Sequence, residues 1–348
     1  MSKNWSRRAL LKDAVVLAGL GSTGRFFPIV SAGPEALAQT KTESKQPGNK
    51  GSALILLGTQ GGPGVNLSRS ETASILVVGD QQYLVDCGYG TLRALIQADL
   101  GFNNLSNIFL THLHNDHTSD VAALLSHKWT SGRARATTVY GSFGTAALVE
   151  GAIAFFKADT EIRIVNEGRT DRPEKLFHGH DFVMSGVTEV FRDERVTVKA
   201  VENTHFPERA KKEMPYQSIA YRFDMADRSI VFSGDTAYSN ALVGLAANAD
   251  VFLCETRGVP TRQQMEQATK EAADNKESIS RHVIETHSTT EDVGRMAAEA
   301  KVKTVVLNHL LGGGTSKSTL ESFESELTAS VRKFFSGQVI VGRDQMRI

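Results

Sequence analysis

The stretch Phe109–Asp120 reads FLTHLHNDHTSD, and it places three histidines and an aspartate within six residues, directly after a short hydrophobic run. Imidazole and carboxylate groups are ligands for zinc and similar divalent ions. One closed tetrahedral structural site would not need so many ligands from a single loop. The stretch therefore predicts two metals side by side, with positions open to water or substrate. A solvated polar loop is the alternative. The expected ligands are His112, His114, Asp116 and His117.

Length and composition are those of a globular protein. The chain has 348 residues, of which 41% are hydrophobic, and this suits one large domain or two small ones. Basic and acidic residues are equal in number, 39 of each, so the charge balance gives no reason to expect nucleic acid as a partner. No apolar run reaches the roughly 18 residues of a membrane-spanning helix, so we expect no membrane span.

The N-terminal segment, residues 1–38, has the pattern of an export signal. A basic start precedes a modest apolar segment, Ala14–Leu20, and the segment ends in an Ala-x-Ala exit. The run Ser6–Lys12, SRRALLK, resembles a signal read by the twin-arginine translocase. We therefore expect residues 1–38 to be a signal peptide, residues 39–50 to be a flexible lead-in, and the protein to be periplasmic or secreted. A basic helix start or a tail anchor is the alternative.

Residues 51–348 have the pattern of one α/β domain. Short apolar runs such as SALILLGT (52–59) and TVVLNH (304–309) are typical of strands. Runs with helical spacing, such as TLRALIQADL (91–100), lie between them. Strands lead each half and helices follow, which predicts an αββα sandwich of two mixed β-sheets with helices outside. Segment 157–195 is charged and gives no clear pattern.

Three further polar residues stand just past buried strands. His205 follows VTVKAVENT, Asp235 follows SIVFSG, and His309 follows TVVLN. A loop at the end of a strand can aim such a side chain into a cleft, and a two-metal site needs more ligands than one loop supplies. Each residue is ordinary by itself, because a lone histidine after a strand is usually a surface or capping residue.

Taken together, THLHNDH, ENTHFP, SGDT and LNHL resemble the metallo-β-lactamase superfamily, and the resemblance covers residues 51–348. It implies the metallo-β-lactamase fold and two divalent metal ions, zinc first, with manganese or iron as alternatives. Asp86, in LVDCGYG, matches an aspartate that orients ligands in this family; a turn aspartate is the alternative. The resemblance assigns the ligands as follows: His112, His114 and His205 to one metal, Asp116, His117 and His309 to the second, and Asp235 as a bridge.

Two more residues narrow the resemblance to the ribonuclease Z branch, which includes phosphodiesterases and arylsulfatases. They are Glu255, in FLCETRG, and His287, in the HST segment before an amphipathic run. In that branch the histidine contacts the reacting anion and a glutamate orients it. His287 would then stabilise transition-state charge or protonate the leaving oxygen. Asp116 would take a proton or simply hold its metal. A strand-end acid and a helix-start residue are the structural alternatives for Glu255 and His287.

The resemblance implies an exported hydrolase in which a metal-bridging hydroxide attacks an aryl sulfate or a phosphodiester. No long basic insertion of the kind that clamps tRNA in ribonuclease Z is found, so a small anionic ester is expected and nucleic acid is not. Asp235 stands where β-lactamases usually have a cysteine, which argues against a β-lactam. A lactonase or carboxylic-ester hydrolase is the alternative. Ligand binding without turnover is a third, lower-ranked hypothesis.

Substrate contacts are expected in HKWTSGR (127–133), because this region borders the pocket mouth in that branch. Trp129 would stack on an aryl group, and Lys128 or Arg133 would attract an anion; core packing is an equal alternative for Trp129. The two cysteines lie in apolar runs and are expected as buried free thiols. A homodimer is the default expectation for such enzymes.

Overall fold

The structure, a computed structural model, describes residues 51–132, 134–258, 285–310 and 317–348. The expected signal peptide (1–38), the lead-in (39–50) and Arg133 therefore lie outside the described residues. The described residues belong to one unit by their internal contacts. None of their helices is both long enough and apolar enough to cross a membrane.

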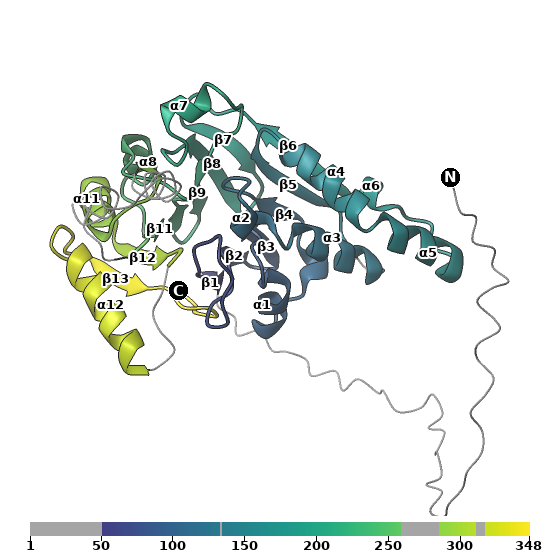
Figure 1. Ribbon diagram of the computed structural model, residues 1–348, viewed down its shortest axis with the longest axis horizontal. Helices are drawn as coiled ribbons and strands as arrows, with labels where there is room; N and C mark the ends of the chain where they lie inside the picture. The colour runs from purple at the N-terminus through teal and green to yellow at the C-terminus, as the bar shows by residue number, and fades with distance from the viewer. Residues whose placement is uncertain (1–50, 133, 259–284, 311–316) are drawn as a thin grey trace, which may run out of the picture. The chain divides into compact units, whose positions relative to one another are not determined.

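Two mixed sheets form the centre of this unit (Figure 1). The first holds six described strands in chain order: β1 (Ser52–Gly58), β2 (Ala73–Val78), β3 (Gln81–Val85), β4 (Asn107–Phe109), β5 (Thr137–Ser142) and β6 (Phe177–Phe182). The second holds seven, also in chain order: β7 (Thr188–Arg192), β8 (Val196–Glu202), β9 (Ile219–Met225), β10 (Ser229–Phe232), β11 (Val251–Glu255), β12 (Thr304–Asn308) and β13 (Gln338–Val341). In each sheet, the early strands pair antiparallel and the later strands pair parallel.

Alternating side chains hold the layers together. In β1, Leu54 and Leu56 join a core between the sheets that also contains Phe109 and Tyr221. Ile55 and Leu57, which point the other way because strand side chains alternate, join a second core outside the first sheet. Each fully buried side chain of this kind stabilises the fold by about 1.5–3 kcal/mol.

Helices cover the outer face of each sheet, as the αββα expectation requires (Figure 1). The outer core of the first sheet takes side chains from α1 (Thr91–Gln97), α3 (Val121–Thr130) and α4 (Thr145–Phe155). The outer core of the second takes side chains from α8 (Asn240–Leu245), α11 (Thr290–Ala300) and α12 (Lys317–Val331). Shorter elements are α2 (Asn115–Thr118), η1 (Phe102–Asn104), α6 (Pro173–Leu176) and α7 (Glu208–Lys211). The predicted fold class is confirmed.

The segment that gave no clear pattern forms α5 (Lys157–Glu167), α6 and the two edge strands β6 and β7. Edge strands are partly exposed to solvent, and β7 has no buried residue at all. Because the segment has no apolar run, neither the helical period nor the strand period could be recognised in the sequence.

Candidate metal centre

The expected ligands stand at the ends of strands from both sheets. At Asp86 and His309 the backbone has φ angles of 62° and 55°. This left-handed conformation is uncommon for residues other than glycine, and it turns the chain sharply where the strand ends. The loops and the short helix α2 then bring together His112 and His114 after β4, Asp116 and His117 on α2, His205 after β8, Asp235 after β10 and His309 after β12.

One group of ligand atoms belongs to His112, His114, His205 and Asp235, and these atoms all lie within 4.8 Å of one another. Nδ1 of His114 lies 3.0 Å from Nε2 of His112 and 3.2 Å from Nε2 of His205. Burial lowers the pKa of both His112 and His205 well below its usual range. Both rings are therefore neutral, and a neutral imidazole presents a lone pair that can bind a metal.

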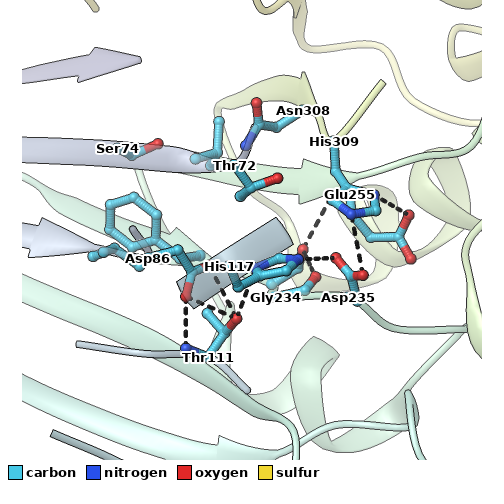
Figure 2. A pocket seen from close by; sticks show the side chains of 14 residues that line it. Thr72, Ser74, Asp86, Thr111, His117, Gly234, Asp235, Glu255, Asn308 and His309 are labelled. Carbon is cyan, nitrogen blue, oxygen red and sulfur yellow. Dashed lines mark hydrogen bonds and ion pairs between the residues drawn. The ribbon is translucent and has the colours of Figure 1, made fainter. Parts of the chain in front are cut away.

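A second group, formed by Asp116, His117, Asp235 and His309, shares Asp235 with the first. Figure 2 shows three of its members, His117, Asp235 and His309, close together. Nε2 of His309 lies 3.2 Å from Oδ2 of Asp116 and 3.1 Å from Oδ2 of Asp235. Nε2 of His117 lies 3.3 Å from Oδ1 of Asp235. One carboxylate thus reaches both groups, which is the arrangement that a bridging ligand requires.

These residues fit divalent cations. Nε2 of His117 and Oδ1 of Asp235 are buried, yet neither atom makes a hydrogen bond within the described part of the chain. Buried polar atoms in native proteins are nearly always satisfied, so such a pair calls for a partner. Nitrogen and carboxylate oxygen donors at this density are the set that binds zinc and related ions.

Hydrogen bonds behind the ligands fix their orientation. Nδ1 of His117 lies 2.9 Å from Oδ2 of Asp86, and that carboxylate also accepts the backbone N–H of Thr111 at 2.8 Å. Nδ1 of His205 lies 3.1 Å from the carbonyl oxygen of Thr286. In both rings Nδ1 is engaged, so Nε2 faces the cluster, as is usual for histidine ligands. Asp86 thus lies behind His117, where the family resemblance implied an aspartate that orients a ligand.

Glu255 and His287 form a buried pair next to the second group. Nδ1 of His287 lies 3.0 Å from Oε1 of Glu255, which also accepts the backbone N–H groups of Thr236 and Ser288. Burial and the neighbouring Asp235 raise the pKa of Glu255 to about 8. The cap of α11 is Thr289, so His287 is not used to start that helix.

Residues 81–310 match the model of a protein family described as the β-lactamase superfamily domain. The match includes every expected ligand. The chain belongs to the metallo-β-lactamase superfamily.

Relatives within this superfamily include ribonuclease Z of Mycobacterium sp. (strain KMS), which is 29% identical over 297 residues, 85% of this chain and 95% of the relative. Among solved structures, the metallo-β-lactamase fold protein YhfI of Bacillus subtilis aligns with a TM-score of 0.59 at 20% identity, over 85% of this chain and 98% of that one. The short form of human tRNase Z aligns with a TM-score of 0.56 at 21% identity, over the same shares. These structural likenesses show the fold.

The glycine-rich loop after β1 also contacts the candidate metal centre, which the sequence motifs above do not predict. The backbone N–H of Gly62 donates to Oδ2 of Asp116 at 2.7 Å. A Cβ atom on Gly62 would lie 2.2 Å from the Asp116 carboxyl carbon, so glycine is needed for this close approach. The run TQGGPG after an apolar strand was the available signal. Arg257 was also missed, because its contact is with Gly62, 195 residues away.

The expected substrate contacts of Lys128 and Trp129 are wrong. The Lys128 side chain is fully buried, and its Nζ donates to the carbonyl oxygens of Phe102, Asn103 and Leu105. Trp129 is 3% exposed and belongs to the core outside the first sheet, where its Nε1 donates to the Asp171 carbonyl. Helix α3 turns both side chains towards the protein interior, so neither can contact an anion or an aryl group in the site. The cysteines Cys87 and Cys254 are buried and free, as predicted.

Proposed function

We propose that this chain is a dinuclear metal-dependent hydrolase of small anionic esters, with phosphodiesters first and aryl sulfates second. The observation that carries the proposal is the sharing of Asp235 between two adjacent ligand groups, next to the His287–Glu255 pair. Two neighbouring sites with a common carboxylate suit reactions in which charge develops on several oxygens of one tetrahedral group.

The seven expected ligands would hold two divalent ions, zinc first, with Asp235 between them. Bound ions of this kind lower the pKa of a coordinated water and neutralise charge on the reacting group. Asp116 accepts the N–H of Gly62 and lies beside His309. Although burial acts against it, the neighbouring His117 and His309 hold the pKa of the Asp116 carboxyl well below its usual range, so it stays ionised. It would hold an ion and receive a proton from water.

His287 acts on the leaving oxygen. With Nδ1 held by Glu255, Nε2 is the atom through which the ring would donate a proton. The ring is buried, which excludes competing water and strengthens its interaction with the developing charge. Glu255 keeps the ring in this orientation.

Phosphodiesters rank first because several relatives are named as ribonuclease Z, and ribonucleases cleave phosphodiester bonds. Aryl sulfates rank second because a sulfate ester has the same tetrahedral, anionic centre. A small ester is favoured over nucleic acid by the chain's formal net charge of zero. Export through the twin-arginine translocase to the periplasm or exterior, and a homodimer, complete the proposal.

The test is hydrolysis by the zinc-loaded protein, with bis-p-nitrophenyl phosphate, p-nitrophenyl sulfate and a simple lactone compared at matched concentration. We expect the highest kcat/KM on the diester, loss of activity on chelation, and two ions per chain by metal analysis. The Asp235→Asn variant should bind fewer ions and lose most activity. A preference for sulfate would support the arylsulfatase reading. Turnover of the lactone alone would favour the lactonase alternative, and no turnover with two ions bound would point to a binding protein.

A further inference from the structure

We propose that Arg257 binds a nonbridging oxygen of the anionic ester and thereby selects anionic over neutral substrates. Arg257 lies two residues after Glu255, just past the end of β11. This inference rests on the proposed function, because it assigns the substrate's charge to a residue of the same site.

Arg257 lies next to the second ligand group. Its Nη2 donates to the carbonyl oxygen of Gly62 at 3.3 Å, and the N–H of Gly62 donates to Asp116 at 2.7 Å. The guanidinium and the Asp116 carboxylate thus contact the same residue, Gly62, one through its carbonyl oxygen and the other through its N–H. The positive charge also acts on the buried carboxyl of Glu255. The side chain is partly exposed, so a ligand entering the site can reach it.

The guanidinium of Arg257 makes fewer hydrogen bonds than those of two other partly buried arginines, Arg228 and Arg222. Arg228 donates to the Ser52 hydroxyl and to the carbonyls of Ser52 and Ile348. Arg222 pairs with Asp224 and donates to two further carbonyls. Arg257 makes one long hydrogen bond, its buried Nε makes none, and it forms no ion pair with any described carboxylate. A buried donor without a partner carries an energetic cost that a ligand oxygen would remove.

The chemistry of the guanidinium identifies the ligand class. Its planar fork of N–H donors matches two oxygens of a phosphate or sulfate group, and such charge-assisted pairs are stronger than neutral hydrogen bonds. A neutral lactone or carboxylic ester offers one carbonyl oxygen and no negative charge in the ground state. Arg257 would therefore lower the KM for an anionic ester and leave the KM for a neutral one nearly unchanged.

The experiment compares wild type, Arg257→Gln and Arg257→Lys, all zinc-loaded. The first readout is the dissociation constant of inorganic phosphate by titration calorimetry, which needs no turnover. The second is kcat and KM on bis-p-nitrophenyl phosphate and on neutral p-nitrophenyl acetate. Arg195→Gln is the matched control. Arg195 directly precedes β8, whereas His205 follows the other end of that strand, and the Arg195 guanidinium forms an ion pair with Asp80. Metal content and thermal unfolding show whether each variant remains folded and loaded.

We expect Arg257→Gln to weaken phosphate binding about tenfold, which is the loss of one charge-assisted hydrogen bond. KM for the diester should rise by a similar factor with a smaller change in kcat, the acetate kinetics should stay within twofold, and Arg257→Lys should be intermediate. Unchanged phosphate binding in a folded, two-metal Arg257→Gln protein would overturn the inference. An equal loss on the acetate would also overturn it, because that result indicates a structural role beside Glu255. If wild type does not hydrolyse the diester, the proposed function fails, while the phosphate titration still decides the role of Arg257.

Discussion

Nδ1 of His117 donates a hydrogen bond to the carboxylate of Asp86 across 2.9 Å, and both groups are buried. Asp86 takes its place through a φ angle of 62°, at the residue directly after β3. The pair links a strand end of the first sheet to a ligand on α2. The contact fixes which nitrogen of His117 faces the cluster. Its loss should therefore reduce the affinity for metal ions and not only the stability of the fold.

Replacing Asp86 by asparagine should weaken metal binding by about 10–100-fold, the usual effect of removing a carboxylate that orients a histidine ligand. Asparagine tolerates positive φ, so the backbone should be retained. Competition with a chelator measures the affinity of each ion. Asp99→Asn is the control, because Asp99 also has a positive φ of 57° but is exposed and belongs to none of the ligand groups. Equal affinities in wild type and Asp86→Asn would rule out the orienting role.

His287→Ala should lower kcat on the diester by about 10²–10⁴-fold, the range for loss of a general acid, while two ions remain bound. His287 contacts Glu255 and belongs to neither of the two groups that share Asp235 but to a third, which has His309 in common with the second. His180→Ala, on exposed edge strand β6, should have no effect on activity. Steady-state kinetics and metal analysis on the same preparation are the measurements. Loss of an ion from His287→Ala would show that the residue is a ligand instead.

Glu255→Gln should be non-additive with His287→Ala, because the carboxylate acts through the ring that the second substitution removes. We expect Glu255→Gln to reduce kcat in the wild-type background and to have little further effect in His287→Ala. A double-mutant cycle on kcat tests this. Independent, multiplicative losses would mean that Glu255 has a separate role, such as holding the Thr236 and Ser288 amides.

Gly62→Ala should reduce activity about 100-fold, the cost of displacing a reacting group by about 1 Å. The added methyl group would lie 2.3 Å from Oδ2 of Asp116, so the carboxylate or the loop must move. Gly64→Ala is a close control in the same loop, since a Cβ atom there meets nothing within 4 Å. Comparison of kcat/KM for the two variants isolates the effect of the contact. Matching activities would show that the loop yields without disturbing Asp116.

The strand ends explain how much of this site the sequence could predict. His205, Asp235 and His309 were identifiable because, together with THLHNDH and in this order along the chain, they resemble the metallo-β-lactamase ligand set, although each residue alone is ordinary after a strand. The layers followed from the same runs. Lys128 shows the limit of this approach. The helical spacing around it could be recognised in the sequence, but the three carbonyl oxygens around η1 that accept hydrogen bonds from its buried ammonium could not. Gly62 and Arg257 were missed for a related reason, because their contacts join segments that no local pattern connects.

Lys128→Met should lower the free energy of unfolding by about 3 kcal/mol, because it leaves buried carbonyls without a donor. It should not change KM, since the lysine faces the core. Urea unfolding and steady-state kinetics provide the two readouts. Lys157→Met, on the exposed surface of α5, should change stability by less than about 0.5 kcal/mol. A raised KM with unchanged stability would restore Lys128 as a substrate contact.

The same lysine gives a pH dependence. Burial lowers the pKa of Lys128 from its usual 10.5 to about 7. Between these values the unfolded chain binds the proton more tightly than the folded protein, so the stability contributed by Lys128 rises with pH across this window. The stability difference between wild type and Lys128→Met should therefore widen from pH 7 to pH 10. A difference that is constant over this range would contradict the shifted pKa.

The residues that would hold each ion come from both sheets, with His112 and Asp116 after β4 of the first and Asp235 after β10 of the second. A bound ion is then a cross-link between the two halves of the chain, and its binding energy is also folding energy. At a free-ion concentration 1,000 times the dissociation constant, one ion would add about 4.1 kcal/mol to the stability of the native state. The concentration of free metal ions in the compartment where the chain folds would therefore set the fraction of the protein that is in the native state, whether or not substrate is present.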